Sequence, residues 1–394
     1  MKYRILGTAA AVSFLLAAGS FTYSVEQPGW DEQMIANNTY GKFVEIDSYS
    51  DSVGIAYIQS KDTGLVFEER SFSTQLPFVG GDADWRRQVI DNRSEVGMYL
   101  SVESDDGRPF VAYQDGDLGD EKLLFAQRQG GQWSSTEVDS VGTGGVSVGM
   151  YNSLSFLEGR PVILYHSPSQ GLKLAERTGG QWDRQSLKEG EGWFTETDTC
   201  GGNLLAAYRS RDTEDLRFGQ YDGEWNSENT SFRTRSDLDL ETGEDCGRHL
   251  LYLNASSDTV VYKSPDENKE FANAFFTRMS LEVDEQPHIL YHDSGTGIVY
   301  STRTDNRWQN KTLREGEDIG RYNDIEVDPS GNIHTVYTDG SKVFYSVYNV
   351  GTVSQKRSAL DGIRAVLSAL TLALTGLVSW KTNLAARIIE KVRS

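Results

Sequence analysis

The sequence predicts an all-β protein, a seven-bladed β-propeller closed by its N-terminal strand. The first observation is a short apolar run ending in Tyr, which recurs seven times at intervals of 39 to 56 residues. A period in this range is typical of arrays that repeat one four-stranded unit. The recurring positions are Tyr57, Tyr113, Tyr165, Tyr208, Tyr252, Tyr291 and Tyr337.

The second observation is a common frame around each Tyr. A strand-like segment such as SLEVDEQ precedes the Tyr strand, a third strand such as GIVYSTR follows it, and a Gly- or Asn-containing turn leads to a Trp and a fourth strand. We interpret these aromatic residues as packing between blades, not as ligand contacts. The Trp positions are Trp85, Trp133, Trp182, Trp225 and Trp308, and Phe271 stands in the fifth repeat where Trp is expected.

The third observation concerns closure of the ring. The seventh repeat runs out after KVFYSVY with no fourth strand, whereas GWDEQMI around Trp30 is left over at the other end of the repeat array. Pairing this N-terminal strand with the last repeat would join the first and last blades and remove an exposed sheet edge. The propeller is therefore expected over residues 24–350.

The two ends of the chain have a different composition. Residues 1–23 combine Lys2 and Arg4 with an apolar stretch and small residues, which indicates a signal peptide; an uncleaved N-terminal anchor is the alternative. Residues 351–362 are expected to be a linker and 363–380 a transmembrane or amphipathic helix. Small residues along that helix favour self-association, hence a homo-oligomer, and residues 381–394 form a short basic internal tail.

Composition excludes several classes of function. The chain has 38 Lys+Arg against 58 Asp+Glu, a net charge of −20, which is unsuited to nucleic-acid binding. Its aromatic content of 11% is too high for a disordered chain, and two Cys cannot form a four-thiolate zinc site. A carboxylate-rich, Lys-poor surface also suggests a halophilic protein, which we state as a hypothesis.

The two cysteines occupy similar positions in neighbouring repeats. Cys200 precedes Tyr208 and Cys246 precedes Tyr252 by a few residues, in what would be the first turns of blades 4 and 5. In an exported protein this placement predicts one disulfide between blades. Two unpaired buried thiols are the alternative.

The repeat frame resembles that of a known group. The segment SLEVDEQPHILYHDSGTGIVYSTRTDNRW resembles repeats of seven-bladed propellers in exported surface proteins of bacteria and archaea, and more loosely sialidase-like and lectin propellers. The resemblance implies the fold over about Trp30 to Tyr348. The sialidase Asp-box, Ser-x-Asp-x-Gly-x-x-Trp, is missing from every repeat, so no catalytic residue is carried over.

One group of candidate ligand contacts lies in loops that lead into each blade. A Gly-x-aromatic motif recurs there, and the residues between Gly and the aromatic vary as a specificity surface would. A sugar ring could stack on an exposed aromatic side chain, although anchoring of the incoming strand would also explain the motif. The candidates are Tyr99, Tyr151, Trp193, Arg321 and Tyr322.

A second group follows the Tyr strands. His166, Arg209, His292 and Asp293 come directly after a Tyr strand, where they could hold a glycan or perform acid–base chemistry. Turn chemistry alone would also explain polar residues at these positions. An enzyme, if present, would be carbohydrate-active and use His292, Asp293, His166 or Asp115.

An acidic loop and five sequons are two further features of the sequence. The loop containing Asp115, Asp117 and Asp120 has enough oxygen atoms for Ca²⁺, with a solvated acidic loop as the alternative; no other metal or cofactor is expected. Five sequons fit an exported glycoprotein. They begin at Asn37, Asn92, Asn229, Asn254 and Asn310.

Together these features predict a membrane-anchored surface recognition protein, exported to a cell surface or viral envelope as a single-pass membrane protein. It would be an adhesin, receptor-binding spike or lectin-like protein that binds a glycan or protein ligand through one face of the propeller. The alternatives are an anchored glycoside hydrolase or polysaccharide lyase, and a structural surface or envelope scaffold.

Overall fold

The computed structural model describes residues 29–60, 62–72, 85–116, 120–141, 147–273 and 278–349. Within these ranges the chain forms 27 β-strands and no helix. Among the same residues there is consequently no helix that could cross a membrane. The predicted segments 1–23, 351–362, 363–380 and 381–394 lie outside the described residues.

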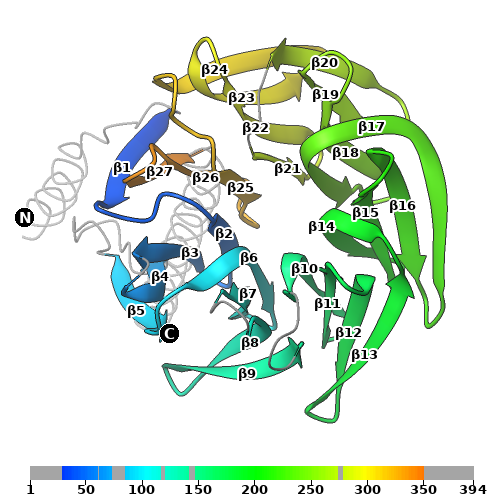
Figure 1. Cartoon of the computed structure of the whole chain (residues 1–394). Coiled ribbons are helices and arrows are strands. Elements are labelled where there is room, and N and C mark those ends of the chain that lie inside the picture. The colour runs from blue at the N-terminus through cyan, green and yellow to red at the C-terminus, as the bar shows by residue number, and fades with distance from the viewer. Residues whose placement is uncertain are drawn as a thin grey trace, which may run out of the picture. The chain divides into compact units, whose positions relative to one another are not determined.

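The strands form antiparallel four-stranded blades in chain order (Figure 1). The first three blades are β2 (Val44–Tyr49), β3 (Ser52–Ser60), β4 (Gly64–Ser71) and β5 (Arg86–Asp91); β6 (Val96–Asp105), β7 (Arg108–Asp115), β8 (Lys122–Gln129) and β9 (Gln132–Ser140); and β10 (Met150–Leu157), β11 (Arg160–Ser167), β12 (Gly171–Thr178) and β13 (Gln181–Lys188).

Blades 4 and 5 share one long strand. In β17 (Trp225–Thr242) the first half pairs with β16 and the second half with β18, so the two blades form a single seven-stranded sheet. The remaining strands of these blades are β14 (Glu191–Cys200), β15 (Asn203–Ser210) and β16 (Asp215–Tyr221), then β18 (Arg248–Asn254), β19 (Thr259–Lys263) and β20 (Asn268–Asn273).

The last two blades close the ring. They are β21 (Met279–Val283), β22 (Pro287–Asp293), β23 (Gly297–Thr304) and β24 (Arg307–Glu315), then β25 (Asn323–Val327), β26 (Ile333–Thr338), β27 (Val343–Tyr348) and the N-terminal β1 (Trp30–Ala36). β1 pairs antiparallel with β27, with Trp30 opposite Tyr348. The inner strands β2, β6, β10, β14, β17, β21 and β25 contact one another in that order, and β25 contacts β2. The predicted closure by the N-terminal strand is therefore confirmed.

The repeated Tyr residues lie in the core of each blade. All seven are at most 4% exposed, on the second strand of their blade. In several blades the hydroxyl donates to a carboxylate of the outer strands, as Tyr113 does to Asp91 at 2.8 Å and Tyr165 to Asp139 at 2.7 Å. These hydrogen bonds satisfy the buried phenols, which supports a structural role.

The repeated Trp residues pack each blade against the one before it. The ring centroid of Trp133 lies 5.0 Å from that of Phe67 on the third strand of blade 1. The ring centroid of Trp182 lies 5.3 Å from that of Phe125 on the third strand of blade 2. Trp30 of the closing strand makes the same contact with Tyr300 of blade 6 at 4.9 Å. The predicted blade-to-blade role of these aromatic residues is confirmed.

The fifth blade departs from this pattern. Tyr300 and Tyr262 are equivalent residues on the third strands of blades 6 and 5. In blade 6, Trp308 on the fourth strand pairs with the third residue after Tyr300. In blade 5, the third residue after Tyr262 already lies in the β19–β20 turn, so no fourth-strand residue can pair with it. The prediction that Phe271 replaces Trp is wrong, because the β19–β20 hairpin is too short to contain that position. Phe271 instead packs on Trp308 at 4.9 Å, in blade 6.

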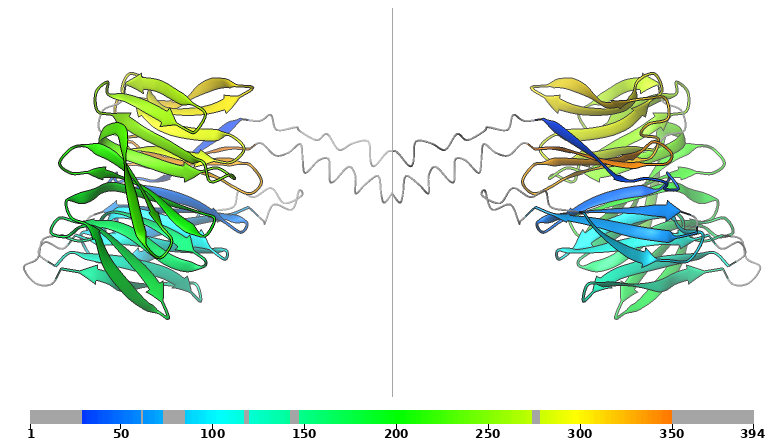
Figure 2. Two further views of the ribbon diagram at one scale, coloured as in Figure 1. Left: turned by 90° about the vertical axis from the view of Figure 1, so that its right-hand side faces the viewer. Right: turned by 90° about the vertical axis from the view of Figure 1, so that its left-hand side faces the viewer.

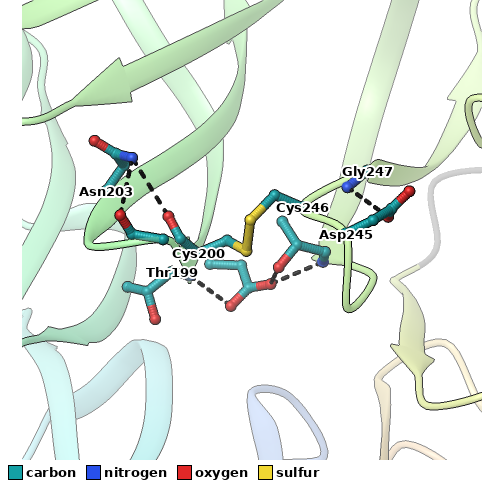
Figure 3. The surroundings of a disulfide bond; sticks show 9 residues. Thr199, Cys200, Asn203, Asp245, Cys246 and Gly247 are labelled. Atoms are coloured by element: carbon teal, nitrogen blue, oxygen red, sulfur yellow. Dashed lines mark hydrogen bonds between the residues drawn. A yellow bond between two sulfur atoms is a disulfide. The ribbon is translucent and has the colours of Figure 1, made fainter.

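The disulfide lies at the seam that lacks a Trp. Cys200 at the end of β14 is bonded to Cys246 in the β17–β18 loop, with 5.6 Å between their Cα atoms, as predicted (Figure 3). Beside it, residues of blades 4 and 5 line a cavity of about 510 Å³. Arg248 covers the Phe218 ring in this cavity at 4.8 Å.

The two ends of the propeller lie on one face. β26 ends at Thr338, whose hydroxyl donates to the carbonyl of Gly41 in a Gly-x-aromatic loop. β27 then runs away from these loops to Tyr348, which pairs with Trp30. In the side views of Figure 2, β1 (blue) and β27 (orange) reach the same face of the propeller. We call the face with the Gly-x-aromatic loops the loop face; Trp30 and Tyr348 lie on the opposite face.

Candidate functional site at the loop end of the central channel

A ring of aromatic side chains surrounds the channel on the loop face. Five Gly-x-aromatic motifs from five blades each place their aromatic residue around one cavity of about 250 Å³, which we call the upper cavity. Neighbouring rings touch, with Tyr99 4.7 Å from Tyr151 and 5.3 Å from Phe43. The ring consists of Phe43, Tyr99, Tyr151, Phe194 and Tyr322.

The backbone that carries this ring is strained. Phe43, Tyr99, Tyr151 and Phe194 have φ between +47° and +54°, a conformation that bulky side chains rarely adopt. The pairing register shifts beside Tyr99, Tyr151 and Phe194, so these three motifs interrupt their inner strands with a bulge. Strain of this kind, repeated in several blades, is typical of positions that are selected for function.

The Gly of each motif allows its backbone to pack closely against the preceding blade. At Gly149, φ is +85° and an added Cβ would lie 2.9 Å from the Cβ of Leu123 in the preceding blade. Only Gly fits at this contact, because any side chain would collide with that residue. The motif thus positions the aromatic residue and packs two blades together.

Arg278 lies below the aromatic ring. Its guanidinium contacts Glu45 and lies 3.7 Å from Asp237 and 4.0 Å from Glu196. Burial raises the pKa of Asp237 to about 6 and that of Glu196 well above its usual range, and the guanidinium counters both shifts. Glu196, Asp237 and Arg278 all line the upper cavity.

The channel continues below Arg278 as a strongly acidic space of about 590 Å³, which we call the lower chamber. Burial is the main cause that raises the pKa of its carboxyl groups, to about 7 for Asp47 and Asp239 and to about 8 for Glu282. Among the described residues that line it, Arg278 is the only basic one. The acidic residues are Glu45, Asp47, Glu103, Glu196, Asp198, Asp239, Glu241, Glu282, Asp324 and Glu326.

The structure brings together four of the predicted ligand contacts. Tyr99, Tyr151, Arg321 and Tyr322 line the upper cavity. Trp193 is half-buried and stacks on Tyr151 at 5.7 Å, while its other neighbours include the Arg209 guanidinium, 5.4 Å from the indole. Trp193 thus packs against Tyr151 of the aromatic ring and does not itself line the cavity.

The structure places the other candidates away from the cavity. His166 and His292 are each 2% exposed, and their Nδ1 atoms hydrogen-bond the backbone oxygens of Glu191 and Ile319, one residue before a Gly-x-aromatic motif. Burial lowers the pKa of His166 to about 4, so this ring is neutral at pH 7. Arg209 is also buried and pairs with Glu214 at 3.4 Å. These residues hold the loops in place.

The remaining candidates lie at strand ends and in the turns that follow them. Asp293 accepts a hydrogen bond from the backbone N–H of Gly295 at 2.8 Å, which is ordinary turn chemistry. Asp115 pairs with Arg93 at 2.5 Å and Asp120 with Lys122 at 3.1 Å, while Asp117 lies outside the described residues. Within the part of the chain that is described, no group of His, Cys, Asp and Glu side chains is arranged to hold a metal ion. The Asn residues of the sequons are exposed, apart from the half-buried Asn254.

Comparison with known proteins agrees with this architecture. No protein-family model matches the chain, and no curated protein matches it. Among solved structures it is similar to a streptogramin B lyase, with 11% identity and a TM-score of 0.53 over 82% of this chain and 98% of that one. It is also similar to an ulvan lyase, with 12% identity and a TM-score of 0.54 over 79% and 95% of the two chains. The chain is a β-propeller. At such low identity the likeness shows the fold alone.

Sequence reasoning missed Arg278 and the carboxylates of the channel. A pattern for the carboxylates was present, because acidic residues alternate along the first strand of several repeats, as in Asp237, Asp239 and Glu241. Alternate residues of a strand point to the same side, and the first strand of a propeller blade lines the channel. Arg278 has no such pattern, since it stands just before β21.

Proposed function

We propose that this propeller is a recognition protein that binds one sugar unit of a glycan in the upper cavity. The observation that carries the proposal is the convergence of five aromatic residues, from five repeats, around one cavity that also contains Arg278 and two carboxylates. Aromatic faces stack on the C–H faces of sugar rings, and a few convergent polar groups fix orientation.

Size and pre-organisation support this class of ligand. At about 250 Å³ the cavity is smaller than the roughly 300–1,000 Å³ of pockets for drug-sized ligands, so it suits a single ring. The strained loops already hold the aromatic side chains in place, which lowers the entropy cost of binding. A longer glycan would extend over Arg321, which is about half-exposed at the rim.

The position of the chain ends fits presentation at a surface. Both ends of the propeller lie on the face opposite the upper cavity, so a tether there would leave the cavity accessible. We propose that residues 363–380 anchor the protein in a cell or viral membrane and that residues 1–23 direct its export. Self-association through the anchor is part of the same proposal.

A carbohydrate-active enzyme is the second candidate. Glu196 and Asp237 line the same cavity with pKa values raised by burial, and a protonated carboxylic acid beside an ionised one is the arrangement that glycosidases use. One similar structure is an ulvan lyase. If the protein is an enzyme, these residues, not His166, Asp115, His292 or Asp293, would perform the acid–base chemistry.

A glycan array run beside a reducing-sugar release assay separates the two candidates. We expect the purified propeller to bind a subset of glycans without releasing sugar. Release that is lost in Glu196→Gln but kept in the surface variant Glu158→Gln would favour the enzyme. Absence of binding to any glycan would contradict the proposal.

A further inference from the structure

The charge around the upper cavity restricts the class of sugar that it can bind. Eleven carboxylate residues line the upper cavity and the lower chamber, against Arg278 and, at the rim, Arg321. Protonation of some of these groups reduces the negative potential. An anionic sugar would enter this field at a large electrostatic cost, whereas a cation would be attracted.

Both arginines already have carboxylate partners. Arg278 already contacts Glu45 and lies near Glu196 and Asp237. Arg321 pairs with Asp318 at 2.7 Å. At Arg278, a carboxylate or sulfate ligand would have to displace a carboxylate of the channel and leave a buried charge unpaired, whereas at Arg321 it would compete with the exposed Asp318.

Two buried polar atoms at the cavity have no partner. The Asn152 amide donates to the backbone oxygens of Tyr99 and Gly149, and its Oδ1 is unpartnered although the residue is only 5% exposed. The Ser236 hydroxyl, on a residue 4% exposed, is unpartnered as well. Both residues line the upper cavity. A buried acceptor without a partner is expensive unless a ligand donor fills it.

In the equivalent asparagine of blade 7, the Oδ1 atom does have a hydrogen-bond partner. Asn323 also follows a Gly-x-aromatic motif and donates to the backbone oxygens of Gly320 and Arg278. Its Oδ1, however, accepts from the Ser280 hydroxyl at 2.8 Å. The same side chain is therefore fully hydrogen-bonded in blade 7, whereas its Oδ1 has no partner in blade 3.

We infer that the upper cavity selects a sugar carrying a protonated amine and rejects acidic sugars. The sugar ring would stack on the aromatic residues, while the ammonium group would face the carboxyl groups of Asp237 and Glu196. Aromatic faces add a favourable cation–π term for such a group. This inference rests on the proposed function and specifies its ligand.

Three tetramers with different charges test the inference on the wild-type protein. Titration calorimetry near pH 6 compares glucosamine, N-acetylglucosamine and galacturonate tetramers. We expect the glucosamine tetramer to bind about tenfold more tightly than its neutral N-acetyl counterpart, because a charge-assisted hydrogen bond is added. We expect no detectable binding of galacturonate. Spermidine, which offers amines without a ring, should bind more weakly than the glucosamine tetramer.

The outcomes are distinguishable. If galacturonate binds as tightly as glucosamine, or if the amine adds nothing over the N-acetyl form, the inference is wrong and the glycan-binding proposal stands. If spermidine binds as tightly as the glucosamine tetramer, the sugar is not what is recognised and the inference is wrong. If these ligands and every glycan on the array fail to bind, both proposals fall.

A matched pair of variants locates the effect. Asp237→Asn should reduce the preference for glucosamine over N-acetylglucosamine several-fold, since it removes a carboxylate facing the ammonium group. Asp183→Asn makes the same change on exposed strand β13 and should leave the preference unchanged. An unchanged preference in a folded Asp237→Asn protein would contradict the assigned contact, and the wild-type series decides the sugar class independently of this variant.

Discussion

Arg278 supplies the positive charge that compensates the carboxylates at the inner end of the upper cavity. It is the only basic residue among the described residues that line both the upper cavity and the lower chamber. Three carboxylates surround it, and its side chain is 20% exposed. Without it, those carboxylates would face one another with no compensating charge. We therefore expect Arg278 to stabilise the channel more than any exposed arginine stabilises the surface.

Replacing this arginine should destabilise the protein in a pH-dependent manner. We expect Arg278→Ala to lower the free energy of unfolding by about 3–5 kcal/mol near pH 8, and by less near pH 5, where the raised pKa values allow the carboxylates to protonate. Arg235→Ala, which breaks an exposed pair with Asp258, should cost about 1 kcal/mol or less. Urea unfolding at both pH values measures this, and equal losses for the two variants would contradict the role given to Arg278.

At the scale of elements, the repeat of Tyr and Trp predicted most of the architecture. Both residues have one packing role in each blade, so their spacing fixes strand order and the contact between successive blades. The prediction failed at Phe271. This residue lies at about the distance along the chain where the repeated Trp is expected, but the β19–β20 hairpin is too short to contain the Trp position. The continuous strand β17 was likewise not predicted, since no Gly or Pro separates its two halves.

The disulfide should compensate for the missing Trp between blades 4 and 5. Cys200 and Cys246 enclose a loop with a sequence separation of 46, for which chain entropy alone predicts about 4 kcal/mol of stabilisation. We expect the double variant Cys200→Ser/Cys246→Ser to lose roughly this amount in urea unfolding. Wild-type protein in reductant should behave in the same way. A loss below about 1 kcal/mol would show that the seam is held by packing alone.

At the scale of the whole molecule, the acidic channel couples stability to pH and salt. Burial raises the pKa of Asp237 to about 6, of Asp47 and Asp239 to about 7 and of Glu282 to about 8, whereas these groups titrate near 4 when unfolded. The folded state therefore binds more protons than the unfolded state between about pH 4 and 8. Stability must then fall as pH rises through this range.

Calorimetry tests this coupling directly. We expect the unfolding temperature to be several degrees higher near pH 5 than near pH 8. We also expect molar KCl to raise it near pH 8 more than near pH 5, since salt screens the ionised carboxylates. An unfolding temperature that is independent of salt would contradict both this account and the hypothesis of a halophilic protein.

The sequence predicted the fold of the whole molecule better than its site. Seven similar repeats and a leftover strand are sufficient to predict a closed ring. The Gly-x-aromatic motifs also identified the loops that meet at the upper cavity. Contacts such as that of Arg278 with Glu45 could not be predicted, because they join opposite ends of the array and form only when the ring closes. Likewise, burial of His166 and His292 under a backbone oxygen is visible only in three dimensions.

Under the proposed function, the aromatic ring of the upper cavity binds a sugar. The most direct measurement is a titration of the tightest-binding array glycan into wild-type protein, Tyr151→Ala and Tyr348→Ala. Tyr151 lines the cavity, whereas Tyr348 lies on the opposite face beside Trp30. We predict that Tyr151→Ala weakens binding about tenfold, through loss of a stacking contact of about 0.5–1.5 kcal/mol and of cavity shape, and that Tyr348→Ala binds like wild type. Equal affinities of folded Tyr151→Ala and wild-type protein would contradict the account.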